Sequence, residues 1–143
     1  MILYLDTSSL VKLYVTETGS EDVRSSVAGA DVVATSVVAF PEARSAFARL
    51  AHEGVLSEED HAAVKAAFLR DWDSFFKIRV LKRVYERAGD LTERHGLRGF
   101  DALHLASYLG VQEGADEEDV VFSAFDHRLT TAAVAEEGAR GPV

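Results

Sequence analysis

Residues 1–14, MILYLDTSSLVKLY, decide the fold of this chain because they join a short apolar run to an acid and three hydroxyl residues. An apolar run of about four to eight residues that is bounded by polar turn residues is typical of a buried strand. The hydroxyl side chains of Thr7–Ser9 favour a helix N-terminus, and apolar residues continue at helical spacing from Leu10. The stretch therefore predicts a strand that ends at Leu5, a turn that holds Asp6, and a helix.

Short apolar runs and helical patterns alternate along the rest of the chain. The apolar runs predict further strands at residues 32–34, 75–81 and 120–124. Capping residues and the spacing of apolar side chains predict helices at residues 20–29, 37–52, 57–72 and 82–96, from Gly99 onward, and at 128–137. In the run 75–81 the apolar residues alternate with Lys77 and Arg79, which predicts a strand at the edge of the sheet.

The order of these elements predicts the fold class. Strands that are separated by one or two helices cannot pair as hairpins, so they need right-handed crossover connections and a parallel sheet. We therefore expect an α/β protein, a three-layer α/β/α sandwich with a central parallel sheet of four to five strands. The chain has 143 residues, of which 48% are hydrophobic, so we expect a single domain over residues 1–143.

The composition excludes several kinds of site. The chain has no cysteine, which removes disulfides, thiolate catalysis and cysteine-bound zinc. A formal net charge of -9 argues against nonspecific coating of nucleic acid, although residues 77–98 hold seven basic and three acidic side chains and can form a local basic face. No apolar run approaches the length of a membrane span, and the first residues lack the basic region of a signal peptide, so we expect a cytoplasmic protein without membrane association.

Four acidic residues stand where a metal site needs them. Asp6 and Asp126 close predicted strands, and open parallel sheets bind their ligands beyond the carboxyl ends of the strands. Glu42 lies in the early turns of a predicted helix, and Asp101 opens the helix that follows Gly99. Carboxylates without lysine or arginine partners repel one another, and a hard divalent cation is what usually holds them together. The pattern therefore indicates a metal enzyme.

The acids belong to four motifs that follow one another along nearly the whole chain. The motifs are LDTSSLVKLY at residues 5–14, Thr35-Ser36 followed by Glu42, FDALHLA at 100–106, and SAFDHRL at 123–129. Each motif alone has little specificity, but the four together in this order resemble the PIN-domain ribonucleases, in particular the VapC toxins of bacterial and archaeal toxin-antitoxin pairs.

The resemblance implies a PIN-like fold and an endoribonuclease that hydrolyses RNA phosphodiester bonds with one or two Mg²⁺ or Mn²⁺ ions. It carries catalytic and metal-binding roles onto Asp6, Glu42, Asp101 and Asp126, and we expect Asp6 and Asp101 to be the main metal ligands. It also implies a toxin with RNA as its substrate, a cognate antitoxin as its protein partner, and a homodimer.

Further residues have supporting roles in this interpretation. Ser8 and Ser123 resemble the small hydroxyl residues that support the acidic quartet. Arg98 and Arg128 lie close in sequence to Asp101 and Asp126, so contact with substrate phosphates is a hypothesis for both arginines. His104 is expected to be a structural residue packed beside Asp101.

Other interpretations stay open at this point. Asp6 alone can cap the first helix, although Thr7–Ser9 already supply caps, and Glu42 alone is most often a solvated helix residue. A Mg-binding phospho-acceptor signalling domain needs a paired acid early and a lysine late, whereas this chain has no lysine after Lys82. A noncatalytic PIN-fold RNA-binding or regulatory module is the remaining alternative, and the presence of all four acids counts against it.

Overall fold

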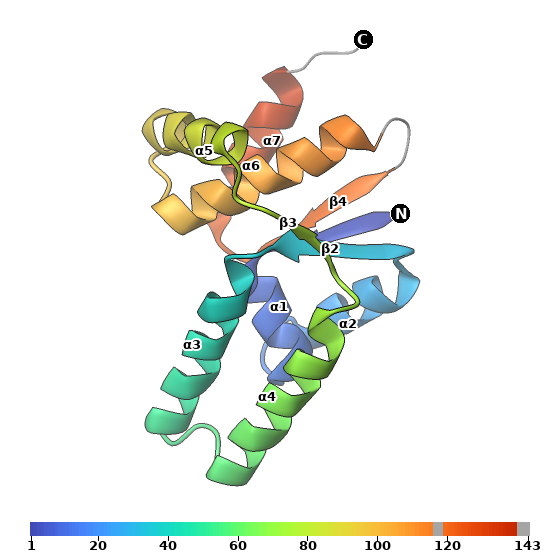
Figure 1. Cartoon of the computed structure of the whole chain (residues 1–143), viewed down its shortest axis with the longest axis vertical. Coiled ribbons are helices and arrows are strands. Elements are labelled where there is room, and N and C mark those ends of the chain that lie inside the picture. The colour runs from blue at the N-terminus through green and yellow to red at the C-terminus, as the bar shows by residue number, and fades with distance from the viewer. Residues whose placement is uncertain (116–118, 140–143) are drawn as a thin grey trace.

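The computed structural model describes residues 1–115 and 119–139, and within them four strands form one parallel sheet. Along the sheet the strand order is β3-β2-β1-β4, and the sheet lies between two layers of helices (Figure 1). The strands are β1 (Ile2–Leu5), β2 (Val32–Ser36), β3 (Phe76–Ile78) and β4 (Val120–Ser123). The predicted three-layer α/β/α sandwich with a parallel sheet is therefore confirmed.

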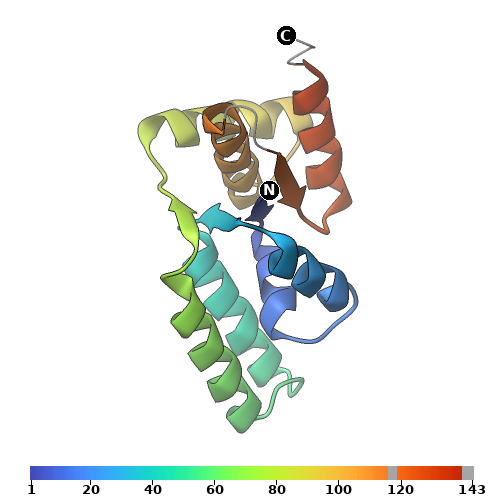
Figure 2. The ribbon, with the colours of Figure 1, turned by 90° about the vertical axis from the view of Figure 1, so that its right-hand side faces the viewer.

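The strand order explains which helices cover each face of the sheet. The chain steps from β1 to β2 to β3 in one direction, then returns past β1 to form β4. Because such crossovers are right-handed, a reversal of direction moves the connecting helices to the other face. One face carries α1 (Thr7–Tyr14), α2 (Ser20–Gly29), α3 (Ala39–His52) and α4 (Glu58–Trp72). The other carries α5 (Lys82–His95), α6 (Gly99–Gly114) and α7 (His127–Ala139), as Figures 1 and 2 show.

Strand β1 holds the two layers together because it is buried on both sides. The side chains of Leu3 and Leu5 belong to the core under α1–α4, whereas Tyr4 belongs to the core under α5–α7. All three are at most 1% exposed. A strand that is covered on both faces needs a continuous apolar run, which is what the sequence has at this point.

The sequence places two acids at the point where the strand order reverses. That point lies between β1 and β4, where Leu5 pairs with Ser123. Asp6 follows β1 directly, and Asp126 follows β4 after two further residues. In open parallel sheets this position forms the ligand crevice, so the fold directs both acids to it.

The third strand lies at an edge of the sheet as predicted, but it is shorter than the predicted run 75–81. Its residues pair with β2 from Ala34 to Ser36, and α3 begins soon after that. Beyond Ile78 there is no β2 backbone for the strand to pair with, so the ladder ends there. Phe76, the first residue of the strand, is 59% exposed.

Helices α3 and α4 extend away from the sheet as a pair (Figure 1), and contacts between aromatic rings join them. Phe68 is fully buried on α4, and its ring centroid lies 5.5–5.7 Å from those of Tyr14, Phe40, Phe47 and Trp72. The Tyr14 hydroxyl also donates a hydrogen bond of 3.0 Å to Asp71 on α4.

No helix in the described part of the chain is long and apolar enough to cross a membrane.

Replacing Phe68 is expected to release α4 from the rest of the fold. Phe68→Ala should lower the free energy of unfolding by about 3–5 kcal/mol, because the ring leaves a cavity among four aromatic neighbours. The adjacent Leu69 is 39% exposed, so Leu69→Ala is the matched control with a much smaller effect. Urea denaturation of both variants measures the difference, and equal losses would contradict this account of how α4 is held.

Candidate active site

All four acids predicted from the sequence line one cleft of about 700 Å³ at the carboxyl ends of the strands. We call it the acid cleft. Asp6 comes from the end of β1, Glu42 from the first turn of α3, Asp101 from the first turn of α6, and Asp126 from the connection between β4 and α7. Four segments that are distant in the sequence thus contribute one acid each.

Asp6 is the most buried of the four acids, with 3% of its surface exposed. The Ser8 hydroxyl donates to both of its oxygens at 2.7 and 2.9 Å, and the Ser9 backbone N–H donates to Oδ1 at 2.9 Å. Burial raises the pKa of the Asp6 carboxyl, and the hydrogen bonds from Ser9 and Ser8 act against this rise. The carboxylate therefore lies in a buried position that favours its neutral form.

Asp6 is also the N-cap of α1, which corrects the expectation that Thr7–Ser9 supply the cap. Its backbone is extended, at φ -75° and ψ 177°, as an N-cap requires, whereas Thr7–Ser9 are already inside the helix. The helix begins one residue earlier than the hydroxyl residues suggested. The capping role and a place in the acid cleft do not exclude each other, because the Ser9 N–H that the cap binds uses Oδ1 and leaves Oδ2 with the Ser8 hydroxyl.

The two predicted supporting serines occupy different positions. Ser8 binds Asp6 directly, and its oxygen also accepts a hydrogen bond of 3.3 Å from the Phe125 backbone N–H. Ser123 lies within hydrogen-bond distance of the Ser9 hydroxyl, at 2.8 Å between the oxygens. Ser123 therefore supports the residue whose backbone binds Asp6, rather than binding an acid itself.

Glu42 is held by a chain of hydrogen bonds that crosses the end of the sheet. Thr7 donates its hydroxyl proton to Glu42 Oε1 at 2.6 Å, and His104 Nε2 lies 3.0 Å from the same oxygen. His104 Nδ1 lies 2.9 Å from the hydroxyl of Tyr4, which is fully buried. The Thr7 hydroxyl donates its proton to Glu42, and the Glu42 carboxylate can only accept, so His104 Nε2 is the nitrogen that carries a proton. Nδ1 then accepts a hydrogen bond from the Tyr4 hydroxyl.

These bonds set the protonation state of Glu42. Burial acts to raise the pKa of its carboxyl, but the hydrogen bonds from His104 and Thr7 outweigh burial and hold the pKa below its usual value. His104 is 1% exposed and was expected to be purely structural. Its contact with Glu42, 62 residues away, has no signal in a single sequence, so sequence reasoning missed its role in the cleft.

Asp101 and Asp126 are less constrained than Asp6 and Glu42. Within residues 1–115 and 119–139, no hydrogen bond to the Asp101 carboxylate is found, and burial together with the charges of Asp126 and Asp6 raises its pKa. Asp126 is exposed, and its Oδ1 accepts a hydrogen bond of 3.0 Å from the Leu129 backbone N–H at the start of α7. Asp101 therefore lies close enough to Asp126 and Asp6 for their negative charges to raise the pKa of its carboxyl.

The two predicted arginines differ in their relation to the cleft. Arg98 lines the acid cleft itself and is exposed. Arg128 lines a neighbouring cavity that also contains Asp101 and Asp126, and its Nη1 donates to the Gly96 carbonyl at 3.1 Å. Among the described residues, neither arginine forms an ion pair with any of the four acids, since the one charged contact of the quartet is between Glu42 and His104.

The donor set fits a hard divalent cation, although it is not arranged as a finished coordination shell. All four candidate ligands are carboxylates, and burial together with the negative charges of Asp126 and Asp6 raises the pKa of Asp101, an effect that a cation would oppose. In the described part of the chain, no three acidic or histidine side chains are close enough to form a metal-binding group.

The burial of Asp6 leads to a prediction about stability in the presence of a chelator. Its folded-state pKa is raised, so its ionisation opposes folding increasingly as the pH rises from the unfolded pKa to the folded pKa. Asp6→Asn should therefore be at least as stable as the wild type at pH 7, because asparagine caps a helix as well as aspartate does. Asp6→Ala should lose about 1 kcal/mol with the cap.

Thermal unfolding at pH 7 and at pH 4 separates the two contributions. Any advantage of Asp6→Asn over the wild type should shrink at the lower pH, where the wild-type carboxyl gains its proton. A wild type that is clearly more stable than Asp6→Asn in chelator would show that the charge itself supports the fold.

The position of His104 generates a second prediction. His104→Ala should lower the free energy of unfolding by about 1–3 kcal/mol, because the buried Tyr4 hydroxyl and Glu42 each lose a partner. His52→Ala, at an exposed position of α3, is the control and should change stability little. Denaturant titration of both variants is the measurement, and similar stabilities would show that the hydrogen-bond chain contributes nothing.

Comparison with known proteins identifies the family of this chain. The PIN-domain family model matches residues 3–135. Two curated proteins of Mycobacterium tuberculosis, ribonucleases VapC45 and VapC49, are each 37% identical to the chain over 136 residues. Each alignment covers 92% of this chain and 89% of the relative. A family match of this extent leaves no place for the phospho-acceptor signalling alternative.

Solved structures show the same fold at lower sequence identity. VapC20 of Mycobacterium tuberculosis, a sarcin-ricin loop cleaving toxin, aligns with a TM-score of 0.63 at 19% identity, over 91% of this chain and 94% of that one. VapBC2 from Rickettsia felis, bound to a DNA fragment from its promoter, aligns with a TM-score of 0.55 at 15% identity, over 88% of this chain and all of that one. By sequence and by fold, this chain belongs to the PIN-domain family and is a relative of the VapC ribonucleases.

Proposed function

We propose that this protein is a divalent-metal-dependent endoribonuclease and the toxin of a toxin-antitoxin pair. The observation that carries the proposal is the acid cleft, in which four carboxylates from four segments meet without a lysine or arginine ion pair among the described residues. The names of the curated relatives support RNA as the substrate. The sarcin-ricin loop activity belongs to VapC20 and does not decide which RNA this chain cleaves.

The proposed metal ligands are Asp6 and Asp101, with Asp126 completing the site and Glu42 binding directly or through water. One or two Mg²⁺ or Mn²⁺ ions held there would supply the Lewis acid that activates water and offsets charge on the leaving oxygen. The oxygen-only donor set supports these ions over softer metals. PIN-domain ribonucleases in general depend on divalent metals.

The remaining residues of the cleft have roles that follow from their contacts. Ser8 and the Ser9 backbone fix the Asp6 carboxylate, and Ser123 steadies Ser9. His104 and Thr7 both bind Glu42 Oε1, which leaves Oε2 without a donor among the described residues and therefore available to the cleft. In the proposed reaction Arg98 contacts a substrate phosphate from within the cleft, whereas Arg128 stands further out.

The proposal extends to partners and location. A cognate antitoxin that covers the acid cleft would keep the enzyme inactive, and the similarity to the VapBC2 structure from Rickettsia felis supports an antitoxin partner. We also propose a homodimer and a cytoplasmic location, which follow from the family resemblance.

A noncatalytic RNA-binding module is the second candidate function. It is favoured by the finding that no three ligating side chains of the described residues form a ready metal-binding group. In that case the acids would be neighbours in the fold without acting together on a cation.

Incubation of the purified protein with RNA tests the proposed activity. The wild type should cleave RNA in Mn²⁺ or Mg²⁺ and should stop in chelator. Asp6→Asn and Asp101→Asn should each lower the cleavage rate by about 100-fold or more, because changes even to second-shell residues of metal sites cost about 10–100-fold. Asp90→Asn, an exposed aspartate on α5, is the matched control and should cleave at the wild-type rate.

Two further results would decide between the candidate functions. Cleavage that persists in both site variants would rule out the acid cleft as the active site. A melting temperature that rises with Mn²⁺ in the wild type, but not in Asp101→Asn, would show a metal site even without cleavage. No shift and no cleavage would favour the noncatalytic module.

A further inference from the structure

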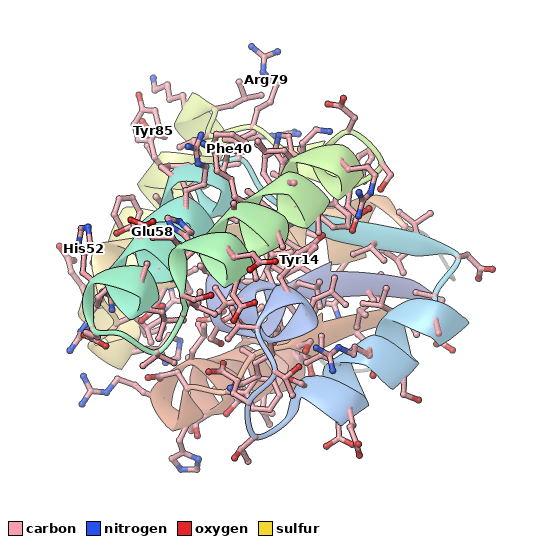
Figure 3. All side chains as sticks on the ribbon, turned by 90° about the horizontal axis from the view of Figure 1, so that it is seen from below. Tyr14, Phe40, His52, Glu58, Arg79 and Tyr85 are labelled. Atoms are coloured by element: carbon pink, nitrogen blue, oxygen red, sulfur yellow. The ribbon has the colours of Figure 1, made fainter. Side chains whose placement is uncertain are left out.

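Two exposed aromatic side chains stand beside the acid cleft without a structural partner. Phe100 directly precedes Asp101 and is 56% exposed, and Tyr85 on α5 is 52% exposed. Within residues 1–115 and 119–139, neither ring makes a hydrogen bond or a contact with another ring or a cation. Figure 3 shows the Tyr85 side chain standing away from its helix at the surface. Single exposed apolar side chains are ordinary, so their position has to carry the argument.

Both rings line the same groove, which continues from the acid cleft between α5 and α6. This second groove, of about 640 Å³, is called the helix groove here. It shares with the acid cleft the residues Glu42, Arg98, Phe100 and Asp101. Phe100 therefore lies at the junction of the two cavities, next to a proposed metal ligand, and Tyr85 lies further along the helix groove.

The walls of the helix groove suit a flat apolar group. Besides the two rings it is lined by Ala88, Gly89 and Thr92 from α5 and by Gly99 and Leu103 from α6. A Cβ atom added at Gly89 would meet nothing within 4 Å, so the groove is open at that point. Exposed aromatic faces in an open groove form a surface on which nucleobases can stack.

A third exposed aromatic residue, Phe125, has a structural explanation and is not included. The Phe125 ring packs closely against Gly19, whose φ is +93°. A Cβ atom at that position would lie 2.6 Å from the ring, so a larger residue would collide with it. Lys12 Nζ also lies 4.7 Å from the ring centroid. Among the described residues, Phe100 and Tyr85 have no comparable contact with a glycine or a cation.

The charge of the acid cleft makes uncharged contacts important for RNA. Five acidic and three basic side chains line it, and the whole chain has a formal net charge of -9. Nucleic-acid binding that relies on phosphate contacts needs clustered lysine and arginine, which this cleft lacks. Stacking on aromatic rings does not depend on charge and contributes affinity for any unpaired base.

We propose that the helix groove binds the unpaired bases of the RNA strand next to the scissile phosphate, with bases stacked on Phe100 and Tyr85. Phe100 and Tyr85 are then positioning residues, and the site selects single-stranded RNA because paired bases cannot reach the rings. The inference rests on the proposed ribonuclease function, since that function supplies the RNA.

The test measures binding in chelator, where no cleavage occurs, so it does not depend on the enzyme being active. The probe is a short single-stranded RNA that carries 2-aminopurine, whose fluorescence falls when the base stacks. Phe100→Leu and Tyr85→Leu should each raise the Kd about fivefold or more and should reduce the quenching. Phe76→Leu removes an equally exposed ring at the amino end of β3 and is the matched control with no effect.

A second variant tests the groove without removing either ring. Gly89→Leu fills the open space on α5 and favours the helix, so it should fold at least as well as the wild type and still weaken RNA binding. The same RNA annealed to its complement should bind the wild type more weakly than the single strand. Unchanged Kd values in Phe100→Leu, Tyr85→Leu and Gly89→Leu, or equal binding of duplex and single strand, would overturn the inference.

Cleavage assays in Mn²⁺ separate this inference from the proposed function. Under the inference, the two aromatic variants raise KM for single-stranded RNA and change kcat little, because they leave the acids in place. Wild-type cleavage with unchanged KM in both variants would overturn the stacking role and leave the ribonuclease proposal intact. RNA binding that depends on the two rings, without any cleavage by the wild type, would support the stacking role and overturn the ribonuclease proposal.

Discussion

The hydrogen bond between His104 and Glu42 joins the two helical layers at the point where the acids meet. His104 belongs to α6 on one face of the sheet, and Glu42 belongs to α3 on the other. The imidazole also contacts Tyr4 in the central strand, and Thr7 binds Glu42 from α1. The Thr7 hydroxyl also lies 2.9 Å from His104 Nε2, so α1 and α3 on one face both contact α6 on the other at the edge of the acid cleft.

The acids of the cleft oppose folding when they are ionised and unpaired, and the fold tolerates them unequally. Asp6 and Asp101 have raised pKa values because burial disfavours their charge, whereas hydrogen bonds from His104 and Thr7 keep the pKa of Glu42 low. Asp6 also accepts hydrogen bonds from Ser8 and Ser9, but these do not outweigh the effect of its burial. Among the described residues, no hydrogen bond to the Asp101 carboxylate offsets its burial and the charges of Asp126 and Asp6.

Much of the fold could be predicted from the sequence because local patterns determine it. The apolar runs and caps predicted the order of strands and helices, and the crossover rule then required a parallel sheet. The predicted strand at 75–81 was too long because its end is set by where β2 stops pairing, which is a tertiary fact. For the site, four motifs indicated the acids, and capping of the first helix by Asp6 was one of the interpretations left open. The contact of His104 with Glu42 depends on geometry that a single sequence does not contain. The exposure of Phe100 in the helix groove could not be predicted from the sequence for the same reason.

The pairing of the first strand with the last has a consequence for the newborn polypeptide. The register of Leu5 with Ser123 brings together two segments that lie 118 residues apart in the chain, so the first has to wait for the second to be made. Until β4 emerges from the ribosome, Asp126 cannot reach the other acids, so the nascent product lacks the complete quartet. If the acids act as proposed, the growing polypeptide has no nuclease activity until Asp126 has been made and β4 has paired with β1.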